Sequence, residues 1–179
     1  MRSVSEVAAL AESAHSGQVD KIGVAYFGHV RAVADGLEPF GDELVMAGLL
    51  HDVLEDTDWT AEKLLGSGIP ARVVEIVEVV TNQAGMTYEE KIRRITADPQ
   101  ATLVKISDNA HNSRADRAAQ LPADKRERLA GKYRAARAAL WPAADPRDVE
   151  AIVRIVNPAL LAELAAQRGT VSVPAEGSA

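Results

Sequence analysis

Residues 42–57 read DELVMAGLLHDVLEDT, a strongly apolar stretch that ends in a group of ionisable side chains. The apolar part has the composition of a helix that is buried in a protein core. It runs directly into His51 and Asp52, and Glu55 and Asp56 follow shortly after. A buried imidazole or carboxylate without a partner is costly, so this cluster favours a counter-ion or a metal ion. An isolated His-Asp pair more often marks a helix end at the surface, so the surrounding sequence has to decide.

Two further segments supply polar side chains of the same kind. In residues 101–114, ATLVKISDNAHNSR, an apolar run leads into Asp108, and Asn112 follows four residues later on the same helical face. Upstream, the loop over residues 17–27 precedes His29, which opens another predicted helix. Three separate segments therefore contribute histidines and aspartates that can meet in one site.

The candidate metal ligands are His29, His51, Asp52 and Asp108. Four nitrogen and oxygen ligands leave coordination positions open for water and substrate, and they suit Mn²⁺, Fe²⁺ or Zn²⁺. The ligand types alone do not choose among these ions. The sequence has no cysteine, which excludes disulfides and thiolate metal sites. The spacing between the histidines and aspartates also differs from the HExxH motif, which argues against a zinc protease.

The two carboxylates after the His-Asp pair are candidate catalytic groups. If the helix over 42–56 continues through the motif, Glu55 lies one turn below His51 and Asp56 lies one turn below Asp52. We therefore expect both carboxylates to line the same cleft as the metal ligands.

Length and charge limit the classes of function. At 179 residues the chain fits a single domain with a sizeable core. A net charge of -6 argues against binding a nucleic-acid backbone, for which a basic surface supplies most of the affinity. The N-terminal segment contains glutamates and no long apolar run, so it resembles neither a signal peptide nor a membrane anchor. We expect a cytoplasmic protein that binds neither membranes nor nucleic acids, and the sequence leaves its oligomeric state open.

The periodicity of apolar residues predicts an all-α protein, a single helical bundle of about eight to ten helices. The predicted helices cover residues 4–16, 28–37, 42–56, 60–66, 70–81, 87–97, 100–118, 122–140, 146–156 and 158–168. We predict one domain over residues 1–168, in which the motifs occupy residues 8–140 and the C-terminal helices residues 146–168. The small, polar segment 169–179 is predicted to be a flexible tail.

Three segments of the chain resemble, in order, the landmark segments of the RelA/SpoT-type HD-domain hydrolase family, which includes the small alarmone hydrolases. They are GQVDKIGVAYFGHV at 17–30, AGLLHDVLEDT at 47–57 and LVKISDNAHNSR at 103–114. The order H, then HD, then D is moderately specific by itself. The extended HDxxEDT, the GQxxKxG loop and the DxxxNxR segment are much more specific.

The resemblance implies a fold, a metal and a reaction. It implies an HD-superfamily helical domain that holds Mn²⁺ through His29, His51, Asp52 and Asp108. The implied activity is hydrolysis of the 3′-pyrophosphate of ppGpp or pppGpp, which yields GDP or GTP and pyrophosphate. A chain of this length leaves no room for a synthetase domain, so we expect degradation of the alarmone only.

The resemblance also implies roles for individual side chains. Glu55 and Asp56 would orient the attacking water or carry its proton. Lys21 would lie against the guanine or its ribose, Asn112 would bond the nucleotide near the metal, and Tyr133 would help to hold the phosphates. Further candidate phosphate partners are Lys91, Arg94, Arg128 and Lys132, although a solvated charged helix face is the better explanation for any single one of them.

One residue of the GQxxKxG loop departs from the family pattern. Where the family carries a pair of basic residues before its glycine, this chain has Asp20 followed by Lys21. A carboxylate near a polyanionic ligand is repulsive, so we expect Asp20 to line the nucleotide mouth and to weaken the binding of ppGpp. Neither of the two remaining histidines is predicted to bind metal: His15 either supports a ligand from behind or simply ends a helix, and His111 is predicted to be a packing residue.

Two alternatives to ppGpp hydrolysis follow from this departure and from the breadth of the fold. The first is an HD phosphohydrolase that acts on another nucleotide, such as the 2′-phosphate of NADPH or a deoxynucleotide. The second is a non-catalytic nucleotide-binding HD module. The second is disfavoured by Glu55 and Asp56, because a pure binding module has no use for two extra carboxylates beside a phosphate.

Overall fold

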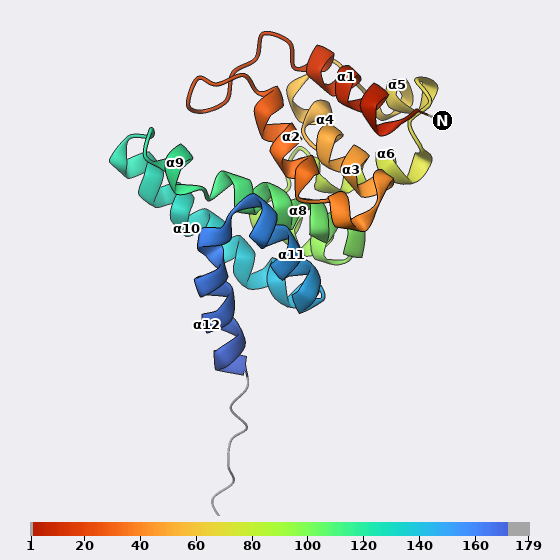
Figure 1. Ribbon diagram of the computed structural model, residues 1–179. Helices are drawn as coiled ribbons and strands as arrows, with labels where there is room; N and C mark the ends of the chain where they lie inside the picture. Colours follow the sequence, from red (N-terminus) through yellow and green to blue (C-terminus); the bar gives the residue numbers. More distant parts are fainter. Residues whose placement is uncertain (1, 172–179) are drawn as a thin grey trace, which may run out of the picture.

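The computed structural model describes residues 2–171 as a bundle of helices (Figure 1). The α-helices are α1 (Val4–Ala14), α2 (Phe27–Asp35), α3 (Asp42–Leu50), α4 (Val53–Asp56), α5 (Ala61–Gly66), α6 (Ala71–Val80), α7 (Tyr88–Thr96), α8 (Pro99–Asn112), α9 (Ala115–Ala118), α10 (Ala123–Leu140), α11 (Pro146–Val156) and α12 (Leu161–Val171). Short 3-10 helices cover Glu38–Phe40, Trp141–Ala143 and Pro158–Leu160. Among these residues the only strand-like pairing is an isolated bridge between Val19 and Ala25. The predicted all-α fold class is therefore confirmed.

Helix α8 lies at the centre of the bundle. It packs against α2, α3, α6, α7, α10 and α11, and Figure 1 shows it between the N-terminal and the C-terminal helices. Asp98 starts this helix by accepting hydrogen bonds from the amides of Gln100 and Ala101, and Pro99 occupies its first turn. Because α8 is surrounded by helices, a polar side chain in its second half is held in place from several sides.

Helices α2 and α3 approach each other closely at a glycine. A Cβ atom on Gly48 would lie 2.9 Å from the Cα of Ala34, which is too close for any side chain larger than hydrogen. The backbone of α3 can therefore lie directly against α2 only because position 48 is glycine. This contact sets the distance between the ends of the two helices, where His29 and His51 are located.

The predicted single helix over 42–56 is wrong, because the chain breaks at the His-Asp pair. Helix α3 ends at Leu50, residues His51 and Asp52 form a turn, and α4 begins at Val53. In a continuous helix the carbonyl of Gly48 would accept the amide of Asp52. Instead it accepts a hydrogen bond of 2.7 Å from Nδ1 of His51. The side chain of the motif thus competes with the helical backbone for the same acceptor.

Other predicted boundaries shift for similar local reasons. The predicted helix over 100–118 stops at Asn112, and a turn separates it from α9. The last helix begins as a 3-10 turn at Pro158 and continues as α12 through Val171. The tail prediction therefore starts too early at 169, and its remaining part, 172–179, lies outside the described residues. No described helix combines the length and the apolar character needed to cross a bilayer.

Candidate metal centre

Three buried side chains meet at the centre of the molecule. His29 comes from α2, His51 from the turn after α3, and Asp108 from the second half of α8. Each offers one ligand atom, and these three atoms lie within 4.8 Å of one another. All three residues are less than 7% exposed, at 4%, 3% and 6%. A buried group of two imidazoles and a carboxylate matches the donor set of a divalent metal ion.

Asp52 lies beside this group and completes the predicted set of four. Its Oδ2 lies 3.0 Å from Nε2 of His51 and 3.5 Å from Nε2 of His29. The hydroxyl of Tyr26 donates a hydrogen bond of 2.6 Å to the same oxygen. The turn at residues 51–52 brings Asp52 to this position, so the break in the helix helps to build the site.

Both histidines are oriented through their Nδ1 atoms. Nδ1 of His51 donates to the carbonyl of Gly48, which leaves Nε2 facing the cluster. Nδ1 of His29 lies 2.7 Å from Nδ1 of His111. Burial, together with His29 and Arg117, lowers the pKa of His111 to about 3, so His111 is neutral near pH 7 and accepts this bond. Nε2 of His29 then also faces the cluster with a free lone pair.

The electrostatics of the cluster favour a cation at its centre. Burial disfavours the charged form of His51, but Asp52 and Asp108 outweigh burial and raise the pKa of this imidazole to about 9. Burial also opposes ionisation of Asp108, but Lys105, with Nζ 2.6 Å from Oδ2, and the histidines hold the pKa of this carboxyl well below its usual range. The carboxylates thus draw positive charge toward this point.

One buried atom of the cluster has no hydrogen-bond partner. Nε2 of His51 lies close to Asp52 and Asp108, but neither contact has the geometry of a hydrogen bond. A buried polar atom without a partner is unfavourable unless another ligand satisfies it. The residues therefore fit a metal ion, because an ion at the meeting point would use this nitrogen.

The cluster borders a cavity of about 300 Å³, here named the polar pocket, which is lined by His29, Asp52 and Asp108 but not by His51. It is lined by Asp20, Lys21, Tyr26, His29, Asp52, Glu55, Asp56, Asn82, Tyr88, Lys91, Lys105, Asp108, Asn112, Arg117, Lys132 and Tyr133. Five of these residues are carboxylic acids and five are lysines or arginines. Apart from His29 the lining is therefore balanced in charge, so a divalent cation would make the pocket attractive to an anion.

The two predicted catalytic carboxylates both line the polar pocket, but they have different surroundings. Glu55 accepts hydrogen bonds of 2.6 Å from the backbone amide and from the side-chain amide of Asn82. It also pairs with Lys91, whose Nζ lies 3.0 Å from Oε1. Both oxygens of Glu55 are therefore engaged in holding the start of the α6–α7 loop and the ammonium of Lys91 at the pocket wall.

Asp56 forms no ion pair with any described residue, and its side chain is exposed. Its carboxylate interacts with the hydroxyl of Tyr26 and, together with Asp52, contributes to the raised pKa of that phenol, for which burial is the largest cause. Its backbone carbonyl accepts a hydrogen bond of 2.6 Å from Gln18, which in turn bonds to Nδ1 of His15. Of the two carboxylates, Asp56 is therefore the one that has no cation beside it among the described residues.

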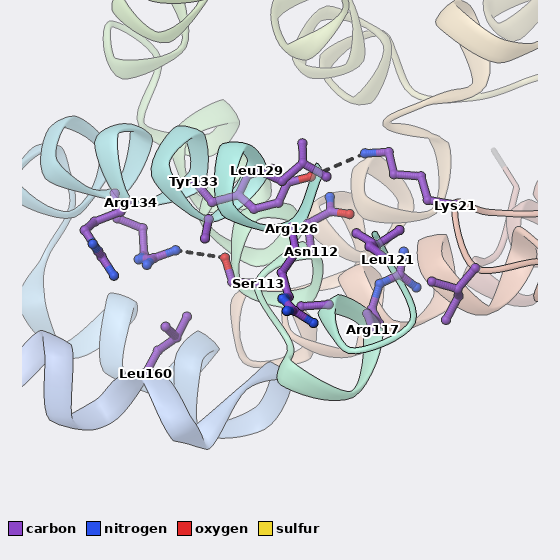
Figure 2. A pocket seen from close by; sticks show the side chains of 14 residues that line it. Lys21, Asn112, Ser113, Arg117, Leu121, Arg126, Leu129, Tyr133, Arg134 and Leu160 are labelled. Atoms are coloured by element: carbon purple, nitrogen blue, oxygen red, sulfur yellow. Dashed lines mark hydrogen bonds between the residues drawn. The ribbon is translucent and has the colours of Figure 1, made fainter. Parts of the chain in front are cut away.

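A second cavity of about 200 Å³, here named the basic pocket, adjoins the first. Its lining is Lys21, Ile22, Asn112, Ser113, Arg117, Ala118, Leu121, Arg126, Leu129, Ala130, Tyr133, Arg134, Arg137 and Leu160. Figure 2 shows Lys21 reaching across it to the hydroxyl of Tyr133, at 3.3 Å. Lys21, Asn112 and Tyr133, the three predicted substrate contacts, line both pockets.

Asp20 lines the polar pocket, as predicted, and its charge is paired with a cation. Its side chain is 3% exposed and lies 2.7 Å from Nη1 of Arg117, which is 14% exposed. It also accepts hydrogen bonds from the amides of Ile22 and Val24, which fold the loop around it. The burial penalty is outweighed by these bonds and by Arg117, so the pKa of Asp20 is lowered. Asp20 therefore shapes the loop and fixes a guanidinium where the two pockets meet.

Sequence patterns missed several members of the site. His111 orients His29, and its position three residues after Asp108 was a usable signal because residues three apart share a helix side. Lys105 was similarly detectable three residues before Asp108. Arg117 and Asn82 have no such helical spacing to a predicted ligand, so the sequence did not indicate them. Of the candidate phosphate partners, Arg94 instead donates to the carbonyls at the end of α6 and Arg128 lines neither pocket.

Comparison with known proteins agrees with this architecture. Residues 8–136 match the model of the HD domain family. A relative from Haemophilus influenzae, named guanosine-3′,5′-bis(diphosphate) 3′-pyrophosphohydrolase, is 37% identical over 134 residues, which cover 68% of this chain and 19% of the relative. A relative from Danio rerio, named guanosine-3′,5′-bis(diphosphate) 3′-pyrophosphohydrolase MESH1, is 36% identical over 104 residues, or 53% of this chain and 57% of the relative.

A solved structure described as a metazoan ortholog of SpoT that hydrolyzes ppGpp has the same fold. It superposes with a TM-score of 0.65 at 23% identity and covers 93% of this chain and 95% of its own. The chain spans about a fifth of the length of the first bacterial relatives it matches. The family match covers all of the segments that supply His29, His51, Asp52 and Asp108. The chain therefore belongs to the HD domain family.

Proposed function

We propose that this protein is a metal-dependent phosphohydrolase that removes the 3′-pyrophosphate from ppGpp and pppGpp. The observation that carries the proposal is the buried meeting of His29, His51 and Asp108 beside a pocket whose walls hold cations. Relatives that are named for this activity match the same part of the chain. In the proposed reaction a water oxygen bonds to the phosphorus next to the ribose, and the bond from that phosphorus to O3′ breaks. The products are GDP or GTP and pyrophosphate.

We assign the metal to His29, His51, Asp52 and Asp108, with Mn²⁺ as the expected ion. Two imidazole nitrogens and two carboxylates suit a borderline-to-hard divalent cation. When bound, such an ion supplies Lewis-acid activation of water and offsets negative charge on the phosphoryl oxygens. The hydrogen bonds from Nδ1 of each histidine keep both Nε2 atoms directed at the ion.

Asp56 is the proposed base, and Glu55 is proposed to act through its partners. The carboxylate of Asp56 is free of cations and lies in the polar pocket, so it can take the proton of the attacking water. Glu55 holds Lys91 and Asn82 at the pocket wall through both of its oxygens. This division refines the expectation that the two carboxylates share one role.

The phosphates of the substrate are proposed to lie between the metal and the lysines of the polar pocket. Lys91 is 6% exposed and Lys132 lies over the ring of Tyr88, so neither ammonium is a freely moving surface charge. Tyr133 and Lys21 reach the same space from the other side, joined by their hydrogen bond. Asn112 donates to Oδ1 of Asp108, which keeps its amide beside the metal centre and within reach of the nucleotide.

The test is a hydrolysis assay with the purified protein, Mn²⁺ and ppGpp, in which GDP and pyrophosphate are both quantified. We expect equal amounts of the two products and no reaction after chelation of the metal. Parallel reactions with NADPH and with deoxynucleoside triphosphates test the alternative substrates. Release of phosphate from NADPH without release of pyrophosphate from ppGpp would contradict the proposed substrate. Tight binding of ppGpp without turnover in the presence of Mn²⁺ would indicate the non-catalytic module instead.

A further inference from the structure

Asp56, the proposed base, is the last residue of a very short helix. Helix α4 covers only the four residues Val53–Asp56. A single helical turn is not stable by itself, because it orders several residues for few hydrogen bonds. The carbonyl groups at its end also lack partners within the helix. The position of Asp56 therefore depends on contacts from outside α4.

One such contact comes from the loop that follows α1. The side-chain nitrogen Nε2 of Gln18 donates a hydrogen bond of 2.6 Å to the backbone carbonyl of Asp56. Glu55 is held differently, because its carboxylate bonds to Asn82 and Lys91. The carboxylate of Asp56 has no cation beside it among the described residues. The bond from Gln18 thus ties the end of α4 to the N-terminal part of the chain.

His15 fixes the direction of the Gln18 amide. Its Nδ1 lies 2.8 Å from Oε1 of Gln18, at the opposite end of the amide from the nitrogen that reaches Asp56. Because an amide oxygen only accepts hydrogen bonds, Nδ1 of His15 is the donor. A flipped amide would place its oxygen against the carbonyl of Asp56, where two acceptors repel. His15 is 2% exposed, and its Nε2 has no hydrogen-bond partner among the described residues, so the bond to Gln18 orients its ring.

Tyr26 connects the same pair to the carboxylates of the site. Its ring lies against that of His15, with the ring centres 4.9 Å apart. Its backbone amide donates to the carbonyl of Gln18 at 3.0 Å. Its hydroxyl donates to Asp52 and interacts with the carboxylate of Asp56. Contacts that rest on His15 and Gln18 therefore reach Asp56 both at its backbone and at its side chain.

The pair formed by His15 and Gln18 lines neither the polar pocket nor the basic pocket. We propose that both are positioning residues, which fix the carboxylate of Asp56 for proton transfer and do not contact the substrate. This inference rests on the proposed function, in which Asp56 takes the proton of the attacking water. A base must lie within hydrogen-bond distance of that water, so loosening α4 lowers the rate while substrate binding stays the same.

The kinetic experiment measures steady-state hydrolysis of ppGpp with Mn²⁺ in variants of the pair. Gln18→Met keeps the length of the side chain and removes both of its hydrogen bonds. We expect kcat to fall by about 10–100-fold with KM nearly unchanged, as for a misplaced catalytic group. His15→Ala should act in the same direction, whereas His15→Asn keeps a donor near the place of Nδ1 and should recover part of the loss. A raised KM with unchanged kcat in Gln18→Met would overturn the proposal.

A double-variant cycle with Asp56→Asn separates positioning from a general loss of structure. If Gln18 acts through Asp56, Gln18→Met should change kcat by less than about twofold in the Asp56→Asn background. An undiminished loss in that background would show that Gln18 acts elsewhere and would overturn the proposal. The matched control is Ser16→Ala, an exposed position in the same segment, which should keep both kcat and KM.

Hydrogen exchange tests the positioning without any reaction. The backbone amides of Glu55 and Asp56 both donate to the carbonyl of Asp52, so their exchange reports how often α4 opens. Gln18→Met should exchange faster in this segment than the wild-type protein or Ser16→Ala, as measured by mass spectrometry. Equal exchange in all three proteins would contradict the proposal. If ppGpp is not hydrolysed while the exchange depends on Gln18, the proposed reaction fails and the fixing of α4 by Gln18 stands.

Discussion

The metal centre and the basic pocket differ in how firmly their side chains are held. At the metal centre His29, His51 and Asp108 are buried, and each is held by a second residue: His51 by Gly48, His29 by His111 and Asp108 by Lys105. In the basic pocket Arg126 and Arg134 of α10 are exposed, and neither forms an ion pair with another described residue. Chemistry requires groups that are fixed before the substrate arrives, whereas recognition of a flexible phosphate tolerates mobile side chains. We therefore expect substitutions at the metal centre to affect turnover and those around the basic pocket to affect binding.

The largest effect is expected for Asp108. Asp108→Ala should abolish hydrolysis and lower the bound metal, because it removes one ligand candidate and leaves the mostly buried Lys105 without its counter-ion. Loss of one partner of a buried pair typically costs about 3–5 kcal/mol, so Asp108→Asn is the variant that better preserves the fold. Metal content by elemental analysis and an activity assay decide the result. Full activity with a normal metal content would contradict the proposed site.

The next largest effect is expected for Asp56, and it distinguishes the roles of the two carboxylates of the polar pocket. Asp56→Asn should lower kcat by about 10²–10⁴-fold with little change in KM, which is the usual effect of losing a general base. Glu55→Gln should lower kcat less and raise KM, because it loosens Lys91 and Asn82 at the pocket wall. Steady-state kinetics of both variants, with metal content as a control, test this order. The reverse order would assign the proton transfer to Glu55.

A smaller effect is expected for His111, which does not reach the metal itself. His111→Ala leaves Nδ1 of His29 without its acceptor and should weaken metal binding by about 10–100-fold, a typical cost of losing such a partner. His111→Gln offers an amide oxygen as a replacement acceptor and should recover part of the affinity. The measurement is a titration of the metal-free protein with Mn²⁺. Equal affinities in both variants and the wild-type protein would show that the bond does not orient His29.

The smallest effect is expected for Asp20, which pairs with Arg117 where the two pockets meet. Asp20→Asn removes the charge that fixes Arg117 but keeps an oxygen for the amides of Ile22 and Val24. KM for ppGpp should rise several-fold with kcat nearly unchanged, because only binding is affected. The comparison is made at low salt, where charge interactions are least screened. A lower KM would mean that Asp20 repels the substrate after all, as its position in the sequence alone suggests.

The sequence by itself determined the fold class and the chemistry of the site. An apolar helix that ends in His51 and Asp52 favours a buried polar site once two further segments supply His29 and Asp108, and ligands without cysteine restrict the metal to ions that accept nitrogen and oxygen. Helical periodicity identified the face that joins Asp108 to Asn112. These features are local, since they depend on residue type and on spacing within one helix.

Only the tertiary structure decided how these pieces work together. The break after Leu50 depends on a side chain that takes a backbone acceptor, and helix propensity does not report such a competition. The pairs His29–His111 and Asp20–Arg117 join residues that are 82 and 97 positions apart. No spacing rule connects residues at such distances, because their contact depends on how α2, α8, α9 and the 17–27 loop pack. The same packing turned Asp20 from an expected obstacle to the substrate into the anchor of a cation beside it.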